Sequence, residues 1–421
     1  MSKRIVLATW GSLGDLHPYM ALARELRRRG DEPVIASIPL YREKVEDAGI
    51  AFHPVRPDFP ASEEAADLVR RAIDRRDGAR FIFRELLGPH LGETYEDTLA
   101  AVTSGSGADL VVSHVIAVTV PLIAEKTGIP WVSTVLSPIS FFSAYDPPTP
   151  PFLSWTRALV GLHPALARAF TGLGKRATRA WVRPVRDLRR ELDLPEGKHP
   201  LFEGQHSPTR VLALFSPVFA PAQPDFPPRT VVTGFPFYDG AEAHPMDPAL
   251  GGFLDSGPPP VLFTLGSSAS WDAGEFYETG GEVAQRLGRR VLLLVGNPEN
   301  IPRRLPDGVA AFEYAPFSRV MPRCSAVVHQ GGIGTTAQAL RAGRPQLVMP
   351  FGHDTLDNAR RVTALGVGQT ASRSRFSARA VARALGELLT AGYEERSEEV
   401  GRQIRAEDGV GTACDLIGQA V

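Results

Sequence analysis

Residues 326–340 read Ala-Val-Val-His-Gln-Gly-Gly-Ile-Gly-Thr-Thr-Ala-Gln-Ala-Leu. A short apolar strand leads into three closely spaced glycines, and a helix is expected from about Gly334. Glycines let backbone N–H groups close around an anion, and the helix N-terminus adds partial positive charge. The stretch therefore predicts a strand–loop–helix unit of an α/β protein with a diphosphate site, to which His329 donates a further hydrogen bond. A tight turn that needs glycine only for space is the alternative.

Short apolar runs alternate with helix-length amphipathic segments along the whole chain, which is typical of parallel sheets with helical crossovers. Strands are expected at 5–9, 34–38, 110–113 and 131–136, and again at 261–265, 291–295, 309–312, 326–329 and 346–349. Residues 216–260 are rich in proline and glycine, which predicts an inter-domain linker. We therefore expect two domains, 1–235 and 236–421, with a last helix that can pack back on the first domain.

The two halves open alike. Residues 5–12 read Ile-Val-Leu-Ala-Thr-Trp-Gly-Ser, and residues 261–268 read Val-Leu-Phe-Thr-Leu-Gly-Ser-Ser. A helix is expected to begin at Pro18 and close at Gly30, and another to span 274–287. The predicted fold class is α/β: two Rossmann-like parallel-sheet domains facing across a cleft, with ligands at the carboxyl ends of the strands.

Composition excludes several classes of protein. The 421 residues carry 46 Lys and Arg against 47 Asp and Glu, a net charge of −1, which argues against a nucleic-acid binder. Two cysteines exclude a disulfide scaffold. Only five basic residues are lysines, and the last is Lys198, so the second half must hold any diphosphate without lysine.

Signals for metals and membranes are absent from the sequence. No Asp-x-Asp motif and no Cys/His cluster with zinc spacing occurs, so we expect no metal. The N-terminal apolar run is too short for a signal peptide, and no stretch approaches the roughly 18 apolar residues of a membrane span. We therefore expect a cytoplasmic protein.

Polar residues follow the strand expected to end at Pro350. His353, Asp354, Asp357 and Asn358 would lie at the carboxyl end of the sheet, where carboxylates and amides suit a hydroxyl-rich ligand. Helix N-capping by either aspartate is the alternative. Residues 332–337 also satisfy the dinucleotide pattern G-x-G-x-x-A, with Asp354 as a ribose-binding acid, and this interpretation stays open.

Taken together, these motifs resemble the donor-binding signature of family 1 glycosyltransferases, which have the GT-B fold. The resemblance covers 313–368, including Tyr-Ala-Pro at 314–316, the His-Gly-Gly loop, Ala-Gly-Arg-Pro at 342–345 and residues 350–358. It is greatest with the bacterial branch of sterol, macrolide, glycopeptide and rhamnosyl transferases, whose Gly-Asp-x-x-Pro opening is similar to residues 14–18.

The resemblance implies a UDP- or dTDP-sugar donor without a metal or other cofactor. Tyr314 would stack on the base, the glycine loop would hold the pyrophosphate, Gln338 would replace a ribose-binding glutamate, and Asp354 would bind sugar hydroxyls. Thr355 stands where the family has glutamine, so a deoxysugar is as credible as glucose. The full donor set is Gly266, Ser267, Tyr314, His329, Gly331, Gly332, Gly334, Thr335, Gln338, Asp354, Thr355 and Asn358. Relative to the plant pattern the loop has one extra residue, which displaces His329 slightly.

An inverting transfer needs a base for the acceptor's proton. Family members place a histidine after the first glycine loop and an activating aspartate after a later strand; here Asp15 and His114 occupy these places with the types exchanged. A free aspartate has a pKa of about 3.9 and is therefore a weak base. Burial would raise this pKa, and a charged His114 would lower it. We expect Asp15 to be the base and keep His17 or His114 as alternatives. For Asp15 the alternative role is helix N-capping, and for His114 packing at a strand end.

The predicted function is therefore an inverting, metal-independent glycosyltransferase acting on a hydrophobic natural-product, sterol or lipid acceptor. Phe141, Phe142, Tyr145 and Trp155 are candidates for the acceptor wall, unless they belong to the core. A nucleotide-sugar epimerase of the same fold and a non-catalytic auxiliary protein are alternatives. We expect a monomer or a homodimer.

Residues 157–190 carry nine Lys or Arg and a single acidic residue, Asp187. A solvated helix whose apolar face packs on its domain is the simpler interpretation. A transient contact with a membrane surface through 155–190 is the alternative.

Overall fold

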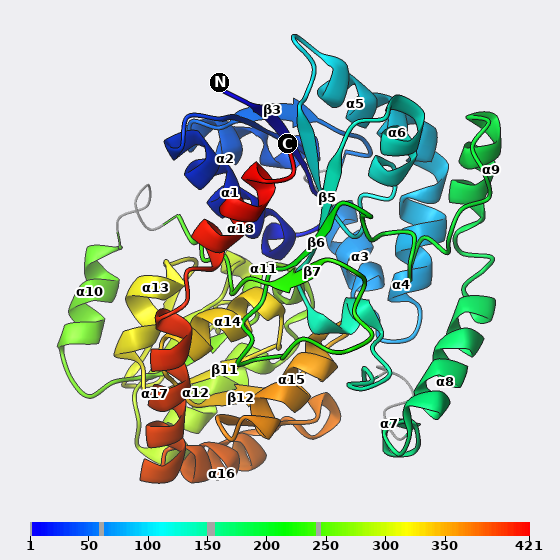
Figure 1. Cartoon of the computed structure of the whole chain (residues 1–421). Helices are drawn as coiled ribbons and strands as arrows, with labels where there is room; N and C mark the ends of the chain where they lie inside the picture. Colours follow the sequence, from blue (N-terminus) through cyan, green and yellow to red (C-terminus); the bar gives the residue numbers. More distant parts are fainter. Residues whose placement is uncertain (1, 59–62, 150–155, 241–245) are drawn as a thin grey trace. The chain divides into compact units, whose positions relative to one another are not determined.

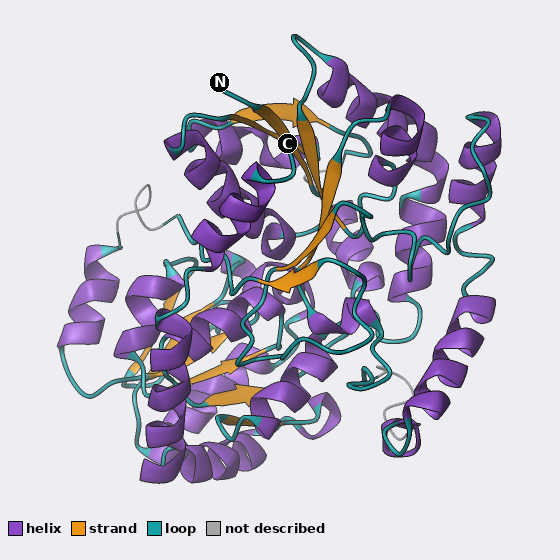
Figure 2. Cartoon of the chain, in the orientation of Figure 1, coloured by secondary structure: helices purple, strands orange, loops and turns teal. Residues whose placement is uncertain are grey.

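The computed structural model describes residues 2–58, 63–149, 156–240 and 246–421, which form two compact units (Figure 1). Unit 1 comprises Met1–Ala72, Arg76–Phe237 and Asp408–Val421, and unit 2 comprises Ile73–Arg75 and Tyr238–Glu407. Each unit has a parallel sheet with helices against it, so the predicted α/β class is confirmed (Figure 2).

Unit 1 contains a seven-stranded sheet with the order β3-β2-β1-β4-β5-β6-β7. The strands are β1 (Arg4–Ala8), β2 (Glu32–Ser37), β3 (Ala51–Pro54), β4 (Leu110–His114), β5 (Trp131–Val135), β6 (Arg210–Ala213) and β7 (Thr230–Val232). The helices are α1 (Leu13–Arg28), α2 (Arg42–Asp47), α3 (Glu63–Ala72), α4 (Gly78–Phe81), α5 (Leu91–Thr103), α6 (Val120–Thr127), α7 (Thr156–Val160), α8 (Pro164–Ala177), α9 (Arg183–Glu191) and α18 (Gly409–Gly418).

Unit 2 repeats this plan with a six-stranded sheet of order β10-β9-β8-β11-β12-β13. Its strands are β8 (Val261–Thr264), β9 (Val291–Leu294), β10 (Val309–Phe312), β11 (Ala326–His329), β12 (Gln346–Val348) and β13 (Gly368–Thr370). Its helices are α10 (Pro248–Asp255), α11 (Gly266–Ala269), α12 (Phe276–Leu287), α13 (Phe317–Val320), α14 (Ile333–Arg341), α15 (Thr355–Ala364), α16 (Ala378–Leu388) and α17 (Ala391–Arg405).

Both sheets reverse their strand order beside the first strand of the unit. In unit 1, β1 lies between β2 and β4, and in unit 2, β8 lies between β9 and β11. Right-handed crossovers then place helices on opposite faces to either side of that point. In open α/β sheets, the ends of the two strands at such a reversal form the crevice in which ligands bind.

Every strand predicted from an apolar run is present, but four strands were missed: β3, β6, β7 and β13. Three of these, β3, β7 and β13, lie at sheet edges and are only partly buried, so they lack the continuous apolar run of a central parallel strand. Strand β7 and helix α10 fall inside 216–260, so the prediction that this whole stretch is a linker was wrong.

The first helix begins earlier than predicted. It starts at Leu13 rather than Pro18, because Ser12 and Asp15 form a capping box. In this box each side chain accepts a hydrogen bond from the backbone N–H of the other residue. Pro18 lies inside α1, where it has no N–H to donate to the Gly14 carbonyl one turn earlier. Asp15 therefore belongs to the first turn of the helix.

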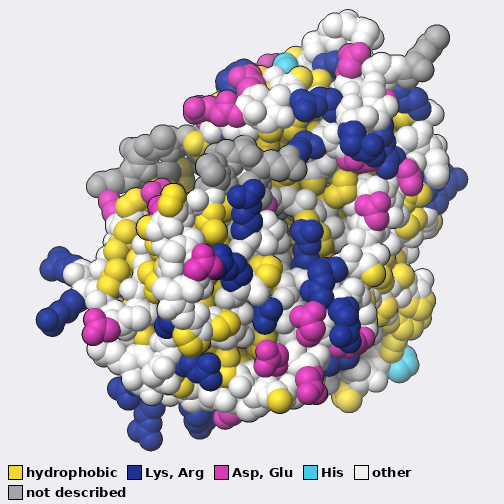
Figure 3. All heavy atoms as spheres, turned by 90° about the vertical axis from the view of Figure 1, so that its left-hand side faces the viewer, with side chains coloured by type: hydrophobic (Ala, Val, Ile, Leu, Met, Phe, Trp, Pro, Cys, Tyr) yellow, Lys and Arg dark blue, Asp and Glu magenta, His cyan; other side chains and the backbone are white. Residues whose placement is uncertain are grey.

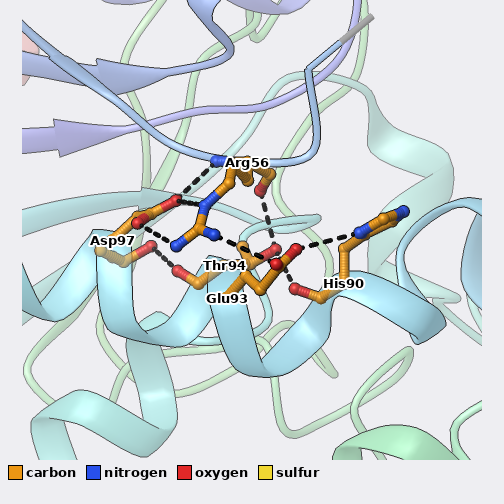
Figure 4. A network of polar contacts seen from close by, with 6 residues as sticks. Arg56, His90, Glu93, Thr94 and Asp97 are labelled. Atoms are coloured by element: carbon orange, nitrogen blue, oxygen red, sulfur yellow. Dashed lines mark hydrogen bonds and ion pairs between the residues drawn. The ribbon is translucent and has the colours of Figure 1, made fainter.

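The segment after β3 is fastened to α5 by one arginine (Figure 4). The Arg56 guanidinium donates to both carboxylate oxygens of Asp97 at 2.8 Å and to Glu93 at 3.1 Å, while Thr94 donates to the Arg56 carbonyl. The guanidinium holds the pKa of Asp97 below its usual range. The network lies at the surface, so it positions this segment more than it stabilises the fold.

The last helix, α18, packs on α1 within unit 1. Cys414 Sγ contacts the Leu22 carbonyl at 3.7 Å, and Arg29 forms an ion pair with Asp415. Gly409, the first residue of α18, faces the backbone of Gly234 and Phe235 so closely that a Cβ there would lie 2.6 Å from the Gly234 carbonyl carbon. Of the helices in the described part of the chain, none is long and apolar enough to cross a membrane.

Substitution of Gly409 tests this close packing. We expect Gly409→Ala to lower the free energy of unfolding by about 1–3 kcal/mol, because the backbone around it must shift. The matched control is Gly418→Ala in the same helix, where a Cβ meets nothing within 4 Å, and its effect is expected to be neutral or slightly stabilising. Urea unfolding followed by circular dichroism measures both, and equal stability of the two variants would contradict the packing argument.

Candidate active site

Asp15 and His114 meet at the crevice of unit 1, one after β1 and the other at the end of β4. The distance from Asp15 Oδ1 to His114 Nε2 is 3.7 Å. The backbone N–H and hydroxyl of Ser12 donate to Asp15 Oδ2 at 2.7 and 3.0 Å. One carboxylate oxygen is therefore fixed by the capping box, and the other faces the imidazole.

His114 is buried, and this determines its charge. Burial lowers the pKa of His114 more than the Asp15 carboxylate and the Trp10 backbone raise it. The Tyr19 ring stands edge-on to the imidazole with 6.2 Å between centroids. The lowered pKa of His114 means that its ring does not place a full positive charge beside Asp15.

Gly11 is a site residue that the sequence analysis did not single out. It adopts φ +130°, and a Cβ there would lie 2.4 Å from Asp15 Oδ2. The Tyr41 hydroxyl donates to the Gly11 carbonyl at 2.9 Å and holds the turn. Only glycine lets the chain pass this close to the carboxylate. The sequence signal for this role was the Gly-Ser pair at 11–12, just after the first strand.

The other candidates of unit 1 lie apart from this pair. His17 is two residues after Asp15 on α1, and residues two apart on a helix do not share a face. Phe141 is buried and stacks on Phe226 at 4.0 Å, so it packs in the core, which was the alternative left open. Phe142 packs on Phe202 at 4.5 Å, and Tyr145 is exposed beside Arg168. Trp155 lies outside the described residues.

In unit 2, β11 delivers His329 to the corresponding crevice, next to the turn after β8. The imidazole is fully buried: Nδ1 accepts from the Gly331 N–H at 3.0 Å, and Nε2 lies 2.9 Å from Gln346 Oε1. Burial lowers the pKa of His329 to about 4, so the ring is neutral. Both ring nitrogens are occupied within the protein, so His329 shapes the glycine loop rather than pointing a free N–H out of it.

Gln330 is the second residue that sequence reasoning missed. Its amide is close enough to Gly266 and Gly332 that a Cβ on either glycine would come within 2.6–2.8 Å of Nε2. Its Oε1 is buried, and no described residue hydrogen-bonds to it. A long polar side chain thus lies between the two turns at the centre of the sheet. The extra residue noted in the loop was the signal that position 330, beside His329, faces the site.

The glycines of the loop have separate geometric roles. Gly331 has φ +87°, and a Cβ there would lie 2.7 Å from Val348 and 2.9 Å from the Thr355 carbonyl. Gly332 is the N-cap of α14, and Gly334 in its first turn is exposed with open space around it. The N-terminus of α14 is therefore accessible, and its N–H groups are available to an anion.

The loop after β12 is tied to the glycine loop by one amide. Asn358 Nδ2 donates to the Gly331 carbonyl at 2.9 Å and to Asp354 Oδ2 at 2.8 Å. Asp354 is the N-cap of α15. The Thr355 hydroxyl donates to the Gly352 carbonyl at 2.7 Å and is buried. Thr355 therefore presents no hydroxyl outward, whereas Asp354 is held in place by Asn358.

Asp357 does not join this group. It is fully buried and pairs with Arg361 at 2.8 Å and Arg360 at 3.2 Å. The expectation that both aspartates of this loop face a ligand was wrong for Asp357, because its carboxylate is consumed by the two arginines.

The remaining donor candidates belong to unit 2 as well. Tyr314 is half exposed, and its hydroxyl donates to the Asp239 carbonyl. Gln338 is largely buried in α14, and Thr335 is buried next to Gly266. Ser267 is exposed in the first turn of α11. Within the described ranges, no group of three His, Cys, Asp or Glu side chains is placed to hold a metal.

Two family models match the chain, one in each half. The glycosyltransferase family 28 N-terminal domain matches residues 5–141, and the C-terminal domain of erythromycin biosynthesis protein CIII-like proteins matches residues 286–409. The first carries Asp15 and His114, and the second carries the loops from Tyr314 to Asn358.

Relatives and solved structures cover the whole chain. The O-mycaminosyltylonolide 6-deoxyallosyltransferase of Streptomyces fradiae is 35% identical over 98% of this chain and 96% of its own length. The vancomycin aglycone glucosyltransferase of Amycolatopsis orientalis is 30% identical over 99% and 98%. The glycosyltransferase of kitacinnamycin superposes with a TM-score of 0.74 at 20% identity, over 100% and 99% of the two chains. The glycosyltransferase VinC, in complex with dTDP, gives 0.68 at 20% identity and 99% coverage of both.

The fold and the two crevices thus define a GT-B glycosyltransferase. The chain belongs to glycosyltransferase family 1 and is an enzyme of the antibiotic-biosynthesis type.

The buried neutral state of His329 makes stability depend on pH. Its folded pKa of about 4 lies below the ordinary 6.5, so the unfolded chain takes up a proton first as the pH falls. We expect the free energy of unfolding to be greatest above pH 6.5 and to fall towards pH 4 by up to about 1.4 kcal/mol per unit. His329→Gln should be less stable at pH 7 by about 1–3 kcal/mol but should show a shallower slope in that window.

Urea titrations at successive pH values measure this slope. The control is His163→Gln, since His163 is exposed at the start of α8 and should leave the slope unchanged. An unaltered slope in His329→Gln would show that the buried ring does not govern the acid response.

Proposed function

We propose that the protein transfers a deoxysugar from a dTDP-sugar to a hydroxyl of an apolar natural-product acceptor, with inversion and without a metal. The observation that carries this proposal is the carboxylate of Asp15, fixed by Ser12 and faced by a neutral histidine at 3.7 Å. A positioned carboxylate at the carboxyl end of a central strand is suited to act as the base that an inverting transfer requires.

In the proposed reaction the acceptor oxygen forms a bond to the anomeric carbon while the bond from that carbon to the diphosphate oxygen breaks. The proton of the acceptor hydroxyl passes to Asp15 Oδ1, and the electron pair leaves with dTDP. Because attack and departure occur on opposite faces of the carbon, the configuration inverts. Asp15 Oδ2 stays hydrogen-bonded to Ser12 throughout, which holds the geometry of the base.

His114 acts as a positioning residue in this proposal. Its burial and low pKa keep it uncharged, so it does not neutralise Asp15 before the proton arrives. Once Asp15 has taken up the proton, the adjacent imidazole is within reach to stabilise or relay it. The exchange of the histidine and aspartate relative to other family members therefore preserves a working acid–base pair.

Unit 2 would hold the leaving diphosphate with neutral donors. The accessible N-terminus of α14 and the amide of Gln330 converge on the crevice beside Gly266. No lysine occurs after Lys198, and in this proposal backbone N–H groups and the helix dipole supply the stabilisation. His329 supports this arrangement by binding the Gly331 N–H from inside.

The nucleotide and sugar are inferred from the loop after β12 and from similar proteins. The dTDP in the VinC complex supports a thymidine nucleotide, and Tyr314, half exposed, is suited to stack on its base. The Thr355 hydroxyl is turned to the Gly352 carbonyl, which leaves Asp354 as the anchored acceptor for sugar hydroxyls. Fewer contacts to hydroxyls suit a deoxysugar, and a relative that is 35% identical is a 6-deoxyallosyltransferase.

Replacing Asp15 tests the base. Asp15→Asn keeps an oxygen for the Ser12 cap but cannot take up the proton, so kcat should fall by about 10²–10⁴-fold. Thermal-shift titration with dTDP should give the same Kd as the native chain. The control is Asp47→Asn at the exposed end of α2, which should keep full turnover.

Both assays use pooled macrolide, aromatic polyketide and sterol acceptors with mass detection of the glycosylated product. Full turnover by Asp15→Asn with dTDP binding intact would exclude Asp15 as the base. Failure of the native chain to be stabilised by dTDP would exclude the donor assignment.

Sugar selectivity tests the role of Thr355. We expect dTDP-6-deoxyglucose to be used with a kcat/KM within about tenfold of dTDP-glucose or above it, because a site that does not bind a hydroxyl loses little when that hydroxyl is absent. Thr355→Val should leave this ratio unchanged within about threefold, since the native hydroxyl bonds to Gly352. A preference for dTDP-glucose greater than about 100-fold would contradict the deoxysugar assignment.

A further inference from the structure

The surface of α7 and α8 carries a row of exposed leucines. Leu159, Leu162, Leu166 and Leu173 have 53%, 73%, 48% and 61% of their surface exposed. Within the described residues, four of the eleven large hydrophobic side chains that are exposed fall in these fifteen positions. We call these four side chains the leucine row.

The leucine row runs from α7 over the connecting turn onto α8, with Leu159 in α7, Leu162 in the turn, and Leu166 and Leu173 in α8. Leu166 and Leu173 are seven positions apart and share one side of α8, and Ala165 and Ala169 are exposed beside them. The inner side buries Ala167, which joins Val160 and Ala144 in a small core cluster with Phe170 packed against it. The helix is therefore anchored by one apolar side and presents a second one outward. A solvated helix, the simpler interpretation from the sequence, would carry polar residues there.

Basic residues border the leucine row. Residues 157–190 hold nine Lys or Arg and one acid, Asp187. Arg176 and Arg179 are exposed, and neither forms an ion pair with another described residue. On the face of the chain drawn in Figure 3, by contrast, basic and acidic side chains are intermixed. Five of the nine basic residues are balanced by ion pairs, namely Arg157, Lys175, Arg183, Arg189 and Arg190. The charge of Arg176 and Arg179, at the end of α8, is not balanced in this way and is positive.

We propose that the leucine row and its basic border, Arg176 and Arg179, form a docking surface for an anionic membrane. An interfacial helix of this kind buries alkyl side chains among lipid chains while its arginines bind phosphate head groups. The docking surface is independent of the proposed function, because it includes neither Asp15 nor His114 nor any residue of unit 2.

The composition of the surface favours lipid over the two protein occupants. A second copy would bring the same arginines face to face, and like charges repel. An acidic protein would match the charge, but protein interfaces centre on aromatic or arginine anchors in pockets with hydrogen bonds. The leucine row carries no aromatic anchor, and the apolar side chains exposed beside it on α8 are alanines, so it needs no more than a fluid apolar phase.

Co-sedimentation of the full chain with vesicles tests the proposal. We expect binding to vesicles of equal parts phosphatidylglycerol and phosphatidylcholine, weaker binding to phosphatidylcholine alone, and loss of binding as NaCl is raised. Leu162→Asn, Leu166→Asn and Leu173→Asn combined should lower the partition coefficient at least about tenfold. Arg176→Gln with Arg179→Gln should lower it on anionic vesicles only.

A matched control is available in unit 2. Ile301 and Leu305 are each 40% exposed, and Arg303 and Arg304 lie between them, but this segment is not helical. Ile301→Asn and Leu305→Asn, with Arg303→Gln and Arg304→Gln, should leave vesicle binding unchanged. All variants should melt within a few degrees of the native chain, because only exposed side chains are altered.

Four results would overturn the proposal. The first is no binding to anionic vesicles at low salt, and the second is binding that survives the triple leucine variant. The third is a concentration-dependent dimer in light scattering that the leucine variant abolishes, without vesicle binding, which would assign the surface to a second copy. Binding of polyglutamate but not of vesicles would assign it to an acidic protein and would overturn the proposal equally.

Discussion

The reversal of strand order beside β1 and β8 is the constraint on which both candidate sites depend. Parallel strands joined by right-handed crossovers leave the carboxyl ends of two neighbouring strands uncovered where the order reverses. In unit 1 those ends carry the Asp15 turn and His114, and in unit 2 they carry Gly266 and His329. The chain uses one topological feature twice, with different side chains each time.

Close backbone approach then decides what each crevice can do. Gly11 brings the chain within van der Waals reach of the Asp15 carboxylate, and Gly331 brings the loop against Val348 and Thr355. In each unit a buried histidine contacts the same turn. His114 lies next to the Asp15 carboxylate, and His329 accepts a hydrogen bond from the Gly331 N–H. Burial lowers the pKa of both imidazoles and so favours their neutral form. The groups left to interact with a ligand are a carboxylate in unit 1 and backbone N–H groups in unit 2.

Much of this was predictable from the sequence, and the failures share a cause. Central strands and glycine turns were predicted correctly because their signals are local. These signals are continuous apolar runs and glycines at turns that need a positive φ. The edge strands β3, β7 and β13 were missed because partial burial removes the apolar run. The start of α1 was misplaced because proline outweighed the Ser12–Asp15 capping box. Asp357 was taken for a ligand residue because its arginine partners three and four positions along were not considered.

By itself the sequence determined the two α/β units, the loops that carry the sites and the family, since strand patterning, glycine positions and motif spacing are properties of neighbouring residues. Tertiary structure alone decided which atoms face outward. His329 turned inward to Gly331 and Gln346, Gln330 took the place between the two glycine turns, and Thr355 bonded to its own loop. The physical reason is that packing decides which of several possible partners a side chain can reach. It brings Gln346 to His329 and Gly266 to Gln330 from other strands, and it buries Thr355 so that its hydroxyl bonds to the nearby Gly352.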